Sequence, residues 1–172
     1  QVISASDDNT VHIWDVRLDP EIEPRRFKGH TSRVNFTAFS PDGTRIASAS
    51  DDNTIHIWDV ATGREIHKLD GHTNRVYSIV FSPDGERIVS ASSDHTVRIW
   101  DALSGKEIPC LVGHTGSVYS AAFSPNGKGI VSAGWDQIVR IWDVETNKVI
   151  RKHKGHTHYV NSIAFSPDGE QV

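Results

Sequence analysis

The sequence has no methionine, a single cysteine, no hydrophobic run longer than a strand and no excess of basic residues. Without long apolar segments it offers no membrane-spanning helix, and the N-terminal QVISASDDNT has neither the basic nor the apolar region of a signal peptide. The lone Cys110 excludes an internal disulfide, so a reducing compartment fits the chain. We therefore expect a soluble, cytoplasmic protein with no membrane partner.

The missing methionine includes the initiator, which indicates a processed product, an excised fragment or a portion of a longer chain. The formal charge of -4 and a sequence pI of about 6.2 leave no basic face for binding a phosphate backbone. Nucleic acid is therefore not expected as a partner.

The dipeptide Gly-His recurs every 42 residues, and the Trp of each later Trp-Asp dipeptide follows a Gly-His histidine by 28 residues, which is the signature of a repeat architecture. In one unit, strand-length runs rich in β-branched and apolar residues alternate with turn formers. The turn SPDG suits type I geometry, because Pro41 presets φ and Gly43 follows. Each unit therefore predicts four short antiparallel strands and no helix. In the second unit these are 34–39, 45–50, 54–59 and 64–69.

The order GHT, SPDG, SAS-x-D and IWD at this period resembles the WD-repeat β-propeller family over the entire chain. The near-identical units are also similar to the long arrays of NACHT-type fungal and bacterial signalling proteins. The resemblance implies an all-β fold of four four-stranded blades arranged radially. We expect blade 1 at 1–28 plus 155–172, blade 2 at 29–70, blade 3 at 71–112 and blade 4 at 113–154.

Every unit holds His, Ser, Asp and Trp in constant register. A Ser-His-Asp set suggests a hydrolase, but Trp only donates and ionised Asp only accepts, so a relay from Trp through Ser and His to Asp satisfies all four groups. Such a relay fits what WD-repeat blades contain. We therefore predict a structural relay, no enzymatic activity and no cofactor. The relay residues are His30, Ser48, Asp52 and Trp58; His72, Ser90, Asp94 and Trp100; His114, Ser132, Asp136 and Trp142; and the divided set His156, Ser4, Asp8 and Trp14.

The divided fourth set predicts how a ring closes. The segment 159–165 has no strands after it, and the N-terminal unit lacks a first strand, so the last strand is expected to complete the first blade. WD-repeat rings usually have seven or eight blades, so we favour a head-to-tail homodimer with eight. A four-bladed monomer and excision from a longer array stay open, since Gln171-Val172 and Gln1-Val2 fall on the same register positions.

Binding specificity is expected where the four units differ from one another. In WD-repeat propellers, the loop after Gly-His, the start of the next strand and the turn before the relay Asp open onto one face, here called the top face. These positions hold Arg, Tyr, Trp and Asn, which are enriched in binding hot spots. We expect a protein or peptide partner with acidic character opposite Arg33 and Arg75. The predicted binding residues are Arg33, Asn35, Asp51, Arg75, Tyr77, Ser93, Ser117, Tyr119, Trp135, Tyr159 and Asn161.

Two other functions stay open: a lectin-like module that senses a small ligand or glycan, and an excised or engineered assembly unit without a selected ligand. The pattern HxxHxH of His153, His156 and His158 hints at a metal. Neither a carboxylate nor a cysteine accompanies it, so no metal is expected.

Two further features are expected to be surface features without a function. His12 and His56 occupy the register position that Arg98 and Arg140 hold in the other units, and this position is expected on a solvated face. The loop 17–26 is longer than its sisters and is expected on the side opposite the top face.

Overall fold

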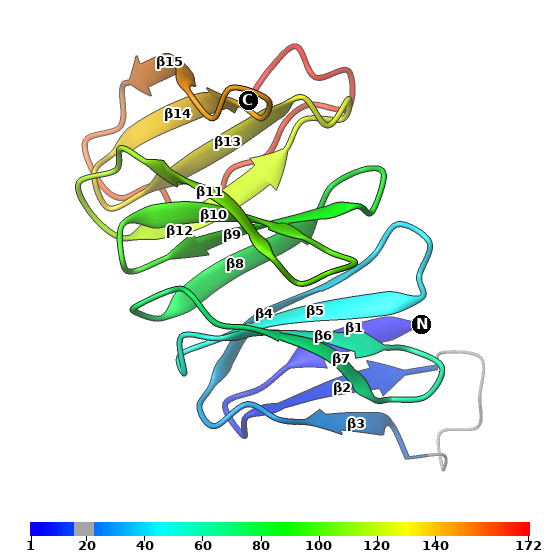
Figure 1. Cartoon of the computed structure of the whole chain (residues 1–172). Coiled ribbons are helices and arrows are strands. Elements are labelled where there is room, and N and C mark those ends of the chain that lie inside the picture. Colours follow the sequence, from blue (N-terminus) through cyan, green and yellow to red (C-terminus); the bar gives the residue numbers. More distant parts are fainter. Residues whose placement is uncertain (16–22) are drawn as a thin grey trace.

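The computed structural model describes residues 1–15 and 23–172. Most of the predicted loop 17–26 lies outside the described residues. The described part is all β, in fifteen strands that form four antiparallel sheets. Figure 1 shows these sheets stacked in chain order. Residues 1–15 and 23–172 contain no helix that could cross a membrane.

The four sheets differ in one respect, since the first has three strands and each of the others has four. The first consists of β1 (Val2–Ala5), β2 (Thr10–Trp14) and β3 (Arg25–Lys28). The second consists of β4 (Val34–Phe39), β5 (Arg45–Ser50), β6 (Ile55–Asp59) and β7 (Glu65–Leu69). The third consists of β8 (Val76–Phe81), β9 (Arg87–Ser92), β10 (Thr96–Asp101) and β11 (Glu107–Val112). The fourth consists of β12 (Val118–Phe123), β13 (Gly129–Gly134), β14 (Ile138–Asp143) and β15 (Val149–Lys154).

The SPDG turns join the first and second strands of the four-stranded sheets. The Gly43 N–H donates to the Ser40 carbonyl at 2.8 Å, and Gly43 has a φ of 70°, which glycine adopts without strain. Ser40 Oγ also accepts the N–H of Arg45 at 2.9 Å. Equivalent bonds to a serine hydroxyl recur at Ser82, Ser124 and Ser166. The turn is therefore fixed by the local sequence.

Apolar side chains fill the space between successive sheets. Val11, Ile13 and Phe27 of the first sheet pack against Ile46 and Trp58 of the second. Equivalent clusters join the second sheet to the third and the third to the fourth. Each buried large apolar side chain contributes on the order of 2 kcal/mol, so the stack is held by its inter-sheet cores.

The C-terminal segment 159–165 lies on the fourth sheet, where the inner strand of a further sheet would lie. Val160 N–H donates to the Gly134 carbonyl at 3.0 Å. Val34 and Ser6, which occupy the same register positions one junction earlier, make the same bond at 3.1 Å. Figure 1 shows the first sheet and the C-terminal segment at opposite ends of the stack.

Within the single chain, segment 159–165 therefore does not complete the first sheet. The four successive sheets leave the two ends of the stack apart, as Figure 1 shows. The expected ring closure stays a prediction, and it requires a partner for each end of the stack.

Candidate functional site

The structure brings His, Ser, Asp and Trp of one unit into contact in three of the sheets. His30 Nε2 lies 2.8 Å from Ser48 Oγ, and this oxygen accepts the Trp58 indole N–H at 2.9 Å. His30 Nδ1 lies 2.9 Å from Asp52 Oδ2. The same contacts measure 2.8 to 2.9 Å around His72. Around the third histidine, His114, they measure 2.8 to 3.0 Å.

The divided fourth set is only partly assembled. Trp14 donates to Ser4 Oγ at 2.9 Å, and Asp8 accepts the N–H of Thr10 at 3.0 Å. His156 is exposed on the C-terminal segment. Trp14 is 44% exposed, whereas the three sister tryptophans are at most 2% exposed. The first sheet therefore has its Trp-Ser pair but not its histidine.

The surroundings of the relay set its charge states. Burial, assisted by the Arg140 guanidinium, lowers the pKa of His114 to about 4. Burial and the neighbouring His56 also lower the pKa of His30. Burial opposes ionisation of Asp52, but hydrogen bonds from Thr54 and Thr31 outweigh it and hold its pKa at about 2. At neutral pH the neutral His30 and His114 therefore face the ionised Asp52 and Asp136.

The relay serines are closed to any substrate. Ser48, Ser90 and Ser132 have no exposed surface, and each accepts an indole N–H. A nucleophilic hydroxyl needs access to a substrate and a nearby oxyanion site. This geometry suits stabilisation of a sheet, because a fully satisfied buried network adds rigidity.

The variable top-face positions meet in pairs, one pair at each junction between successive units. The residue three places after a Gly-His histidine contacts the residue just before the relay Asp of the preceding unit. At the first junction Arg33 Nε lies 3.0 Å from Asp7 Oδ1, and at the second Arg75 Nε lies 3.6 Å from Asp51 Oδ2. Both arginines therefore already have an acidic partner within the chain.

The two later junctions are uncharged. The hydroxyls of Ser93 and Ser117 lie 3.0 Å apart. At the last junction the rings of Trp135 and Tyr159 stack, with centroids 5.8 Å apart and planes inclined at 24°. The contact thus changes from ion pairs through a hydroxyl pair to an aromatic stack.

The aromatic stack continues into a longer row. The rings of Tyr77 and Tyr119 lie 5.3 Å apart, and those of Tyr119 and Tyr159 lie 6.3 Å apart, both edge to face. We call Tyr77, Tyr119, Tyr159 and Trp135 the aromatic row. Trp135 is 48% exposed and Tyr159 is 42% exposed, so the row presents a sizeable apolar surface.

Gly116 allows Trp135 to lie flat. A Cβ atom at Gly116 would lie 2.6 Å from Cε3 of the indole, closer than atoms can pack. The ring therefore lies close to Gly116 and stacks on Tyr159.

The two predicted asparagines behave differently. Asn35 donates to Asp51 at 2.7 Å and to the Val76 carbonyl at 2.9 Å, which joins the second sheet to the third. Asn161 is exposed on the C-terminal segment. Asn35 is therefore occupied within the chain, and Asn161 faces solvent.

The expectation of a solvated face at His56 and Arg140 is wrong. The two side chains are buried, with 2% and 3% of their residues exposed. His56 Nδ1 lies 2.6 Å from Glu65 Oε2, and Arg140 Nη1 lies 2.7 Å from both Asp136 Oδ2 and His114 Nδ1. The position points toward the relay of its own sheet, and the fourth strand and the Gly-His loop cover it.

The comparison with protein families agrees with this geometry. The family model described as WD domain, G-beta repeat matches residues 1–15, 23–59, 63–101, 105–143 and 147–172, and the chain belongs to this WD-repeat family. Each full match ends at Trp-Asp, which is the end of the third strand of a sheet. One sequence repeat therefore spans the last strand of one sheet and the first three strands of the next. Proteins of this family generally act as non-enzymatic scaffolds that mediate protein–protein interactions.

Among curated proteins, the chain is similar to Ribosome assembly protein 4 of Chaetomium thermophilum. The two are 45% identical over 47 residues, which is 27% of this chain and 9% of that protein. The chain therefore spans only a small part of that relative. The similarity to NACHT-type arrays stays a prediction.

Proposed function

We propose that the chain is a non-enzymatic scaffold that binds a protein or peptide across the aromatic row of its top face. The observation that carries the proposal is the exposed stack of Trp135 on Tyr159. Exposed aromatic surface of this kind marks interaction sites, and Trp and Tyr are enriched in hot spots. Because Gly116 and Tyr159 hold the indole, binding orders little further and costs little conformational entropy.

The row also indicates the chemistry of the partner. Arg33 and Arg75 are paired with Asp7 and Asp51, so an acidic partner would have to displace a carboxylate. The aromatic row carries no charge. We therefore propose a segment that presents apolar or aromatic side chains to the row, with any acidic residue in a secondary position.

The experiment is a selection of peptides from a displayed library on the wild-type chain, followed by calorimetric titration of a selected peptide. Trp135→Ala is expected to weaken binding by about tenfold or more. The matched control is Leu103→Ala, an exposed apolar side chain at the opposite end of the strands, which should bind as the wild type does. Unchanged binding by Trp135→Ala contradicts the proposal. Ligands found only on a glycan array would favour the lectin-like alternative.

We also propose that two copies close one eight-bladed ring head to tail. The first sheet lacks an inner strand, and segment 159–165 lies in an inner-strand position without a sheet of its own. Exchange between two copies supplies the missing partner at both places. In a longer array, neighbouring repeats would fill the same places.

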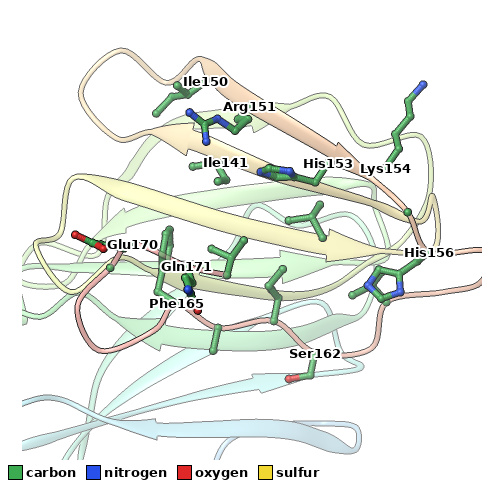
Figure 2. A pocket seen from close by; sticks show the side chains of 17 residues that line it. Ile141, Ile150, Arg151, His153, Lys154, His156, Ser162, Phe165, Glu170 and Gln171 are labelled. Atoms are coloured by element: carbon green, nitrogen blue, oxygen red, sulfur yellow. The ribbon is translucent and has the colours of Figure 1, made fainter.

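A groove supports the exchange. It has a volume of about 1010 Å³ and lies between the fourth sheet and the C-terminal segment, as Figure 2 shows. Val139 and Ile141 line it. These two residues occupy the same repeat positions as Val11 and Ile13, which pack on Trp58 of the following sheet. The groove is therefore suited to a tryptophan of a following sheet.

Trp14 of a second copy is that tryptophan. It has the register of Trp58 and is the exposed member of its set. Docking it in the groove would also bring His156 to Ser4, which completes the fourth relay. Val172 has the same register as Val2, so it has to leave this place when the second copy docks.

A further inference from the structure

Two histidines and a carboxylate meet inside the second sheet, away from the aromatic row. One ligand atom from each of His30, Asp52 and His56 lies within 4.8 Å of the others. Both histidines are buried, and Asp52 is nearly so. Two imidazoles and one carboxylate form a donor set typical of divalent transition metals, including Zn²⁺ sites with an open fourth position.

The sister sheet shows what occupies this place when the residues differ. In the fourth sheet, Arg140 Nη1 lies 2.7 Å from His114 Nδ1 and 2.7 Å from Asp136 Oδ2. A permanent cation thus lies against both the relay His and the relay Asp. The second sheet keeps the same His-Asp pair but has His56 at the arginine position.

The geometry points to a divalent transition metal, Zn²⁺ foremost, that takes the place of this guanidinium in the second sheet. Its ligands are His30 Nδ1, His56 Nε2 and the Asp52 carboxylate. Binding displaces the proton that His30 Nδ1 donates to Asp52, and the His30 ring then donates from Nε2 to Ser48 Oγ. At this position the fourth sheet has the cationic side chain of Arg140, whereas the second sheet has His56, which would bind a metal cation.

The hydrogen bond to Glu65 orients the His56 imidazole for this role. Glu65 Oε2 lies 2.6 Å from His56 Nδ1, which leaves His56 Nε2 facing Thr54 Oγ1 at 3.1 Å. That hydroxyl lies 2.6 Å from Asp52 Oδ1 and 3.5 Å from His30 Nδ1, so it marks the centre of the site. A carboxylate behind a ligating histidine is the usual outer partner of a metal site.

The charges also match. Two carboxylates lie against the two imidazoles, since Asp52 Oδ2 is 2.9 Å from His30 Nδ1 and Glu65 Oε2 is 2.6 Å from His56 Nδ1. A divalent ion would give the largely buried Asp52 carboxylate a cationic partner, and unpaired buried charge is costly.

The test is a Co²⁺ titration of the whole chain followed by visible absorption, with displacement by Zn²⁺. We expect one Co²⁺ per chain, and a melting temperature that rises when Zn²⁺ is added. The matched variant is His56→Arg, which installs the residue of both sister sheets and should lower Co²⁺ affinity by tenfold or more. His153, His156 and His158 are the competing exposed cluster. A variant with all three changed to Ala should keep the affinity of the wild type.

The proposal is overturned if the chain takes up no Co²⁺, if His56→Arg binds as the wild type does, or if the triple variant loses the site. Circular dichroism checks that His56→Arg folds. If His56→Arg does not fold, the Co²⁺ affinity of Glu65→Gln is measured instead. The half-exposed Glu65 is not a ligand and affects the metal only by orienting His56. We expect Glu65→Gln to weaken Co²⁺ binding by about tenfold or more, and unchanged binding contradicts the site.

Discussion

The Trp135 indole stacks on the Tyr159 ring at the same register positions where Asp7 and Arg33 form an ion pair. The two contacts occupy equivalent places at different junctions, and each joins two complementary side chains. These pairs are among the features that distinguish one junction from the next. A change on one side alone should therefore weaken the junction.

A double-mutant cycle at the last junction measures this match. Trp135→Asp and Tyr159→Arg should each destabilise the chain, and the two together should recover part of the loss, because they recreate the first junction. The stack itself should couple by about 0.5–1.5 kcal/mol in an alanine cycle. Urea denaturation measures both quantities. A coupling of zero would mean that the rings lie together without stabilising each other.

The relay can be tested with a control that the chain itself supplies. Ser90→Ala removes the acceptor of Trp100 and the partner of His72, so we expect a loss of about 1–3 kcal/mol in the free energy of unfolding. Ser4→Ala removes the same oxygen beside the exposed Trp14 and should cost clearly less in the single chain. Equal losses at pH 7 under monomeric conditions would argue against a stabilising role for the completed relay.

Stability should fall on mild acidification. The pKa of His114 is about 4 in the folded chain, against 6.5 for an unperturbed histidine. Between these values the unfolded chain binds a proton that the folded chain does not, so the free energy of unfolding decreases as pH falls from 6.5 to about 4. Each unit of pKa difference corresponds to about 1.4 kcal/mol.

Denaturation curves across this pH range check the prediction. His114→Asn should flatten the pH dependence, whereas His158→Asn, at an exposed position, should leave it unchanged. A pH profile that His114→Asn does not alter would assign the acid sensitivity to other groups. Asp52, with a pKa of about 2 against 3.8, adds a further loss of stability only at lower pH.

Gly116 is expected to matter for binding rather than for folding. In Gly116→Ala the new methyl group displaces the indole of Trp135 from Tyr159, because the ideal Cβ position lies 2.6 Å from the ring. Affinity for a peptide selected on the wild type should fall, and chemical shifts of the Trp135 indole should move. Gly43→Ala is the control, because it strains a backbone with a φ of 70° while its Cβ meets no atom within 4 Å. If Gly116→Ala binds the peptide as tightly as the wild type, the stack of Trp135 on Tyr159 is not part of the binding site.

The strands and turns could be predicted from the sequence because they depend on local chemistry. SPDG fixes its own turn through Ser40 and Gly43, and β-branched runs define the strands between the turns. The contacts between His, Ser, Asp and Trp could be inferred from their constant spacing, since only one arrangement satisfies all four groups.

The remaining features depend on how elements pack, which spacing does not reveal. The burial of His56 depends on the cover that Gly29 and Glu65 provide. One signal was present, however, because Glu65 and Glu107 occupy the same repeat position, and their side chains contact His56 and Arg98. The junction pairs likewise join different units, although the matched changes of Asp with Arg, Ser with Ser and Trp with Tyr could have indicated them. The number of sheets in a ring follows from the rotation at each junction, and no local pattern sets this.

The mass of the chain in solution shows most directly whether Trp14 and His156 of two copies complete each other's sheets. Light scattering coupled to size exclusion should report about twice the 19.1 kDa of one chain. Trp14→Asp should return the mass to that of one chain, while Leu103→Asp, at an exposed position, should leave the pair intact. A wild-type mass of 19.1 kDa at all protein concentrations would contradict the exchange of ends between two copies.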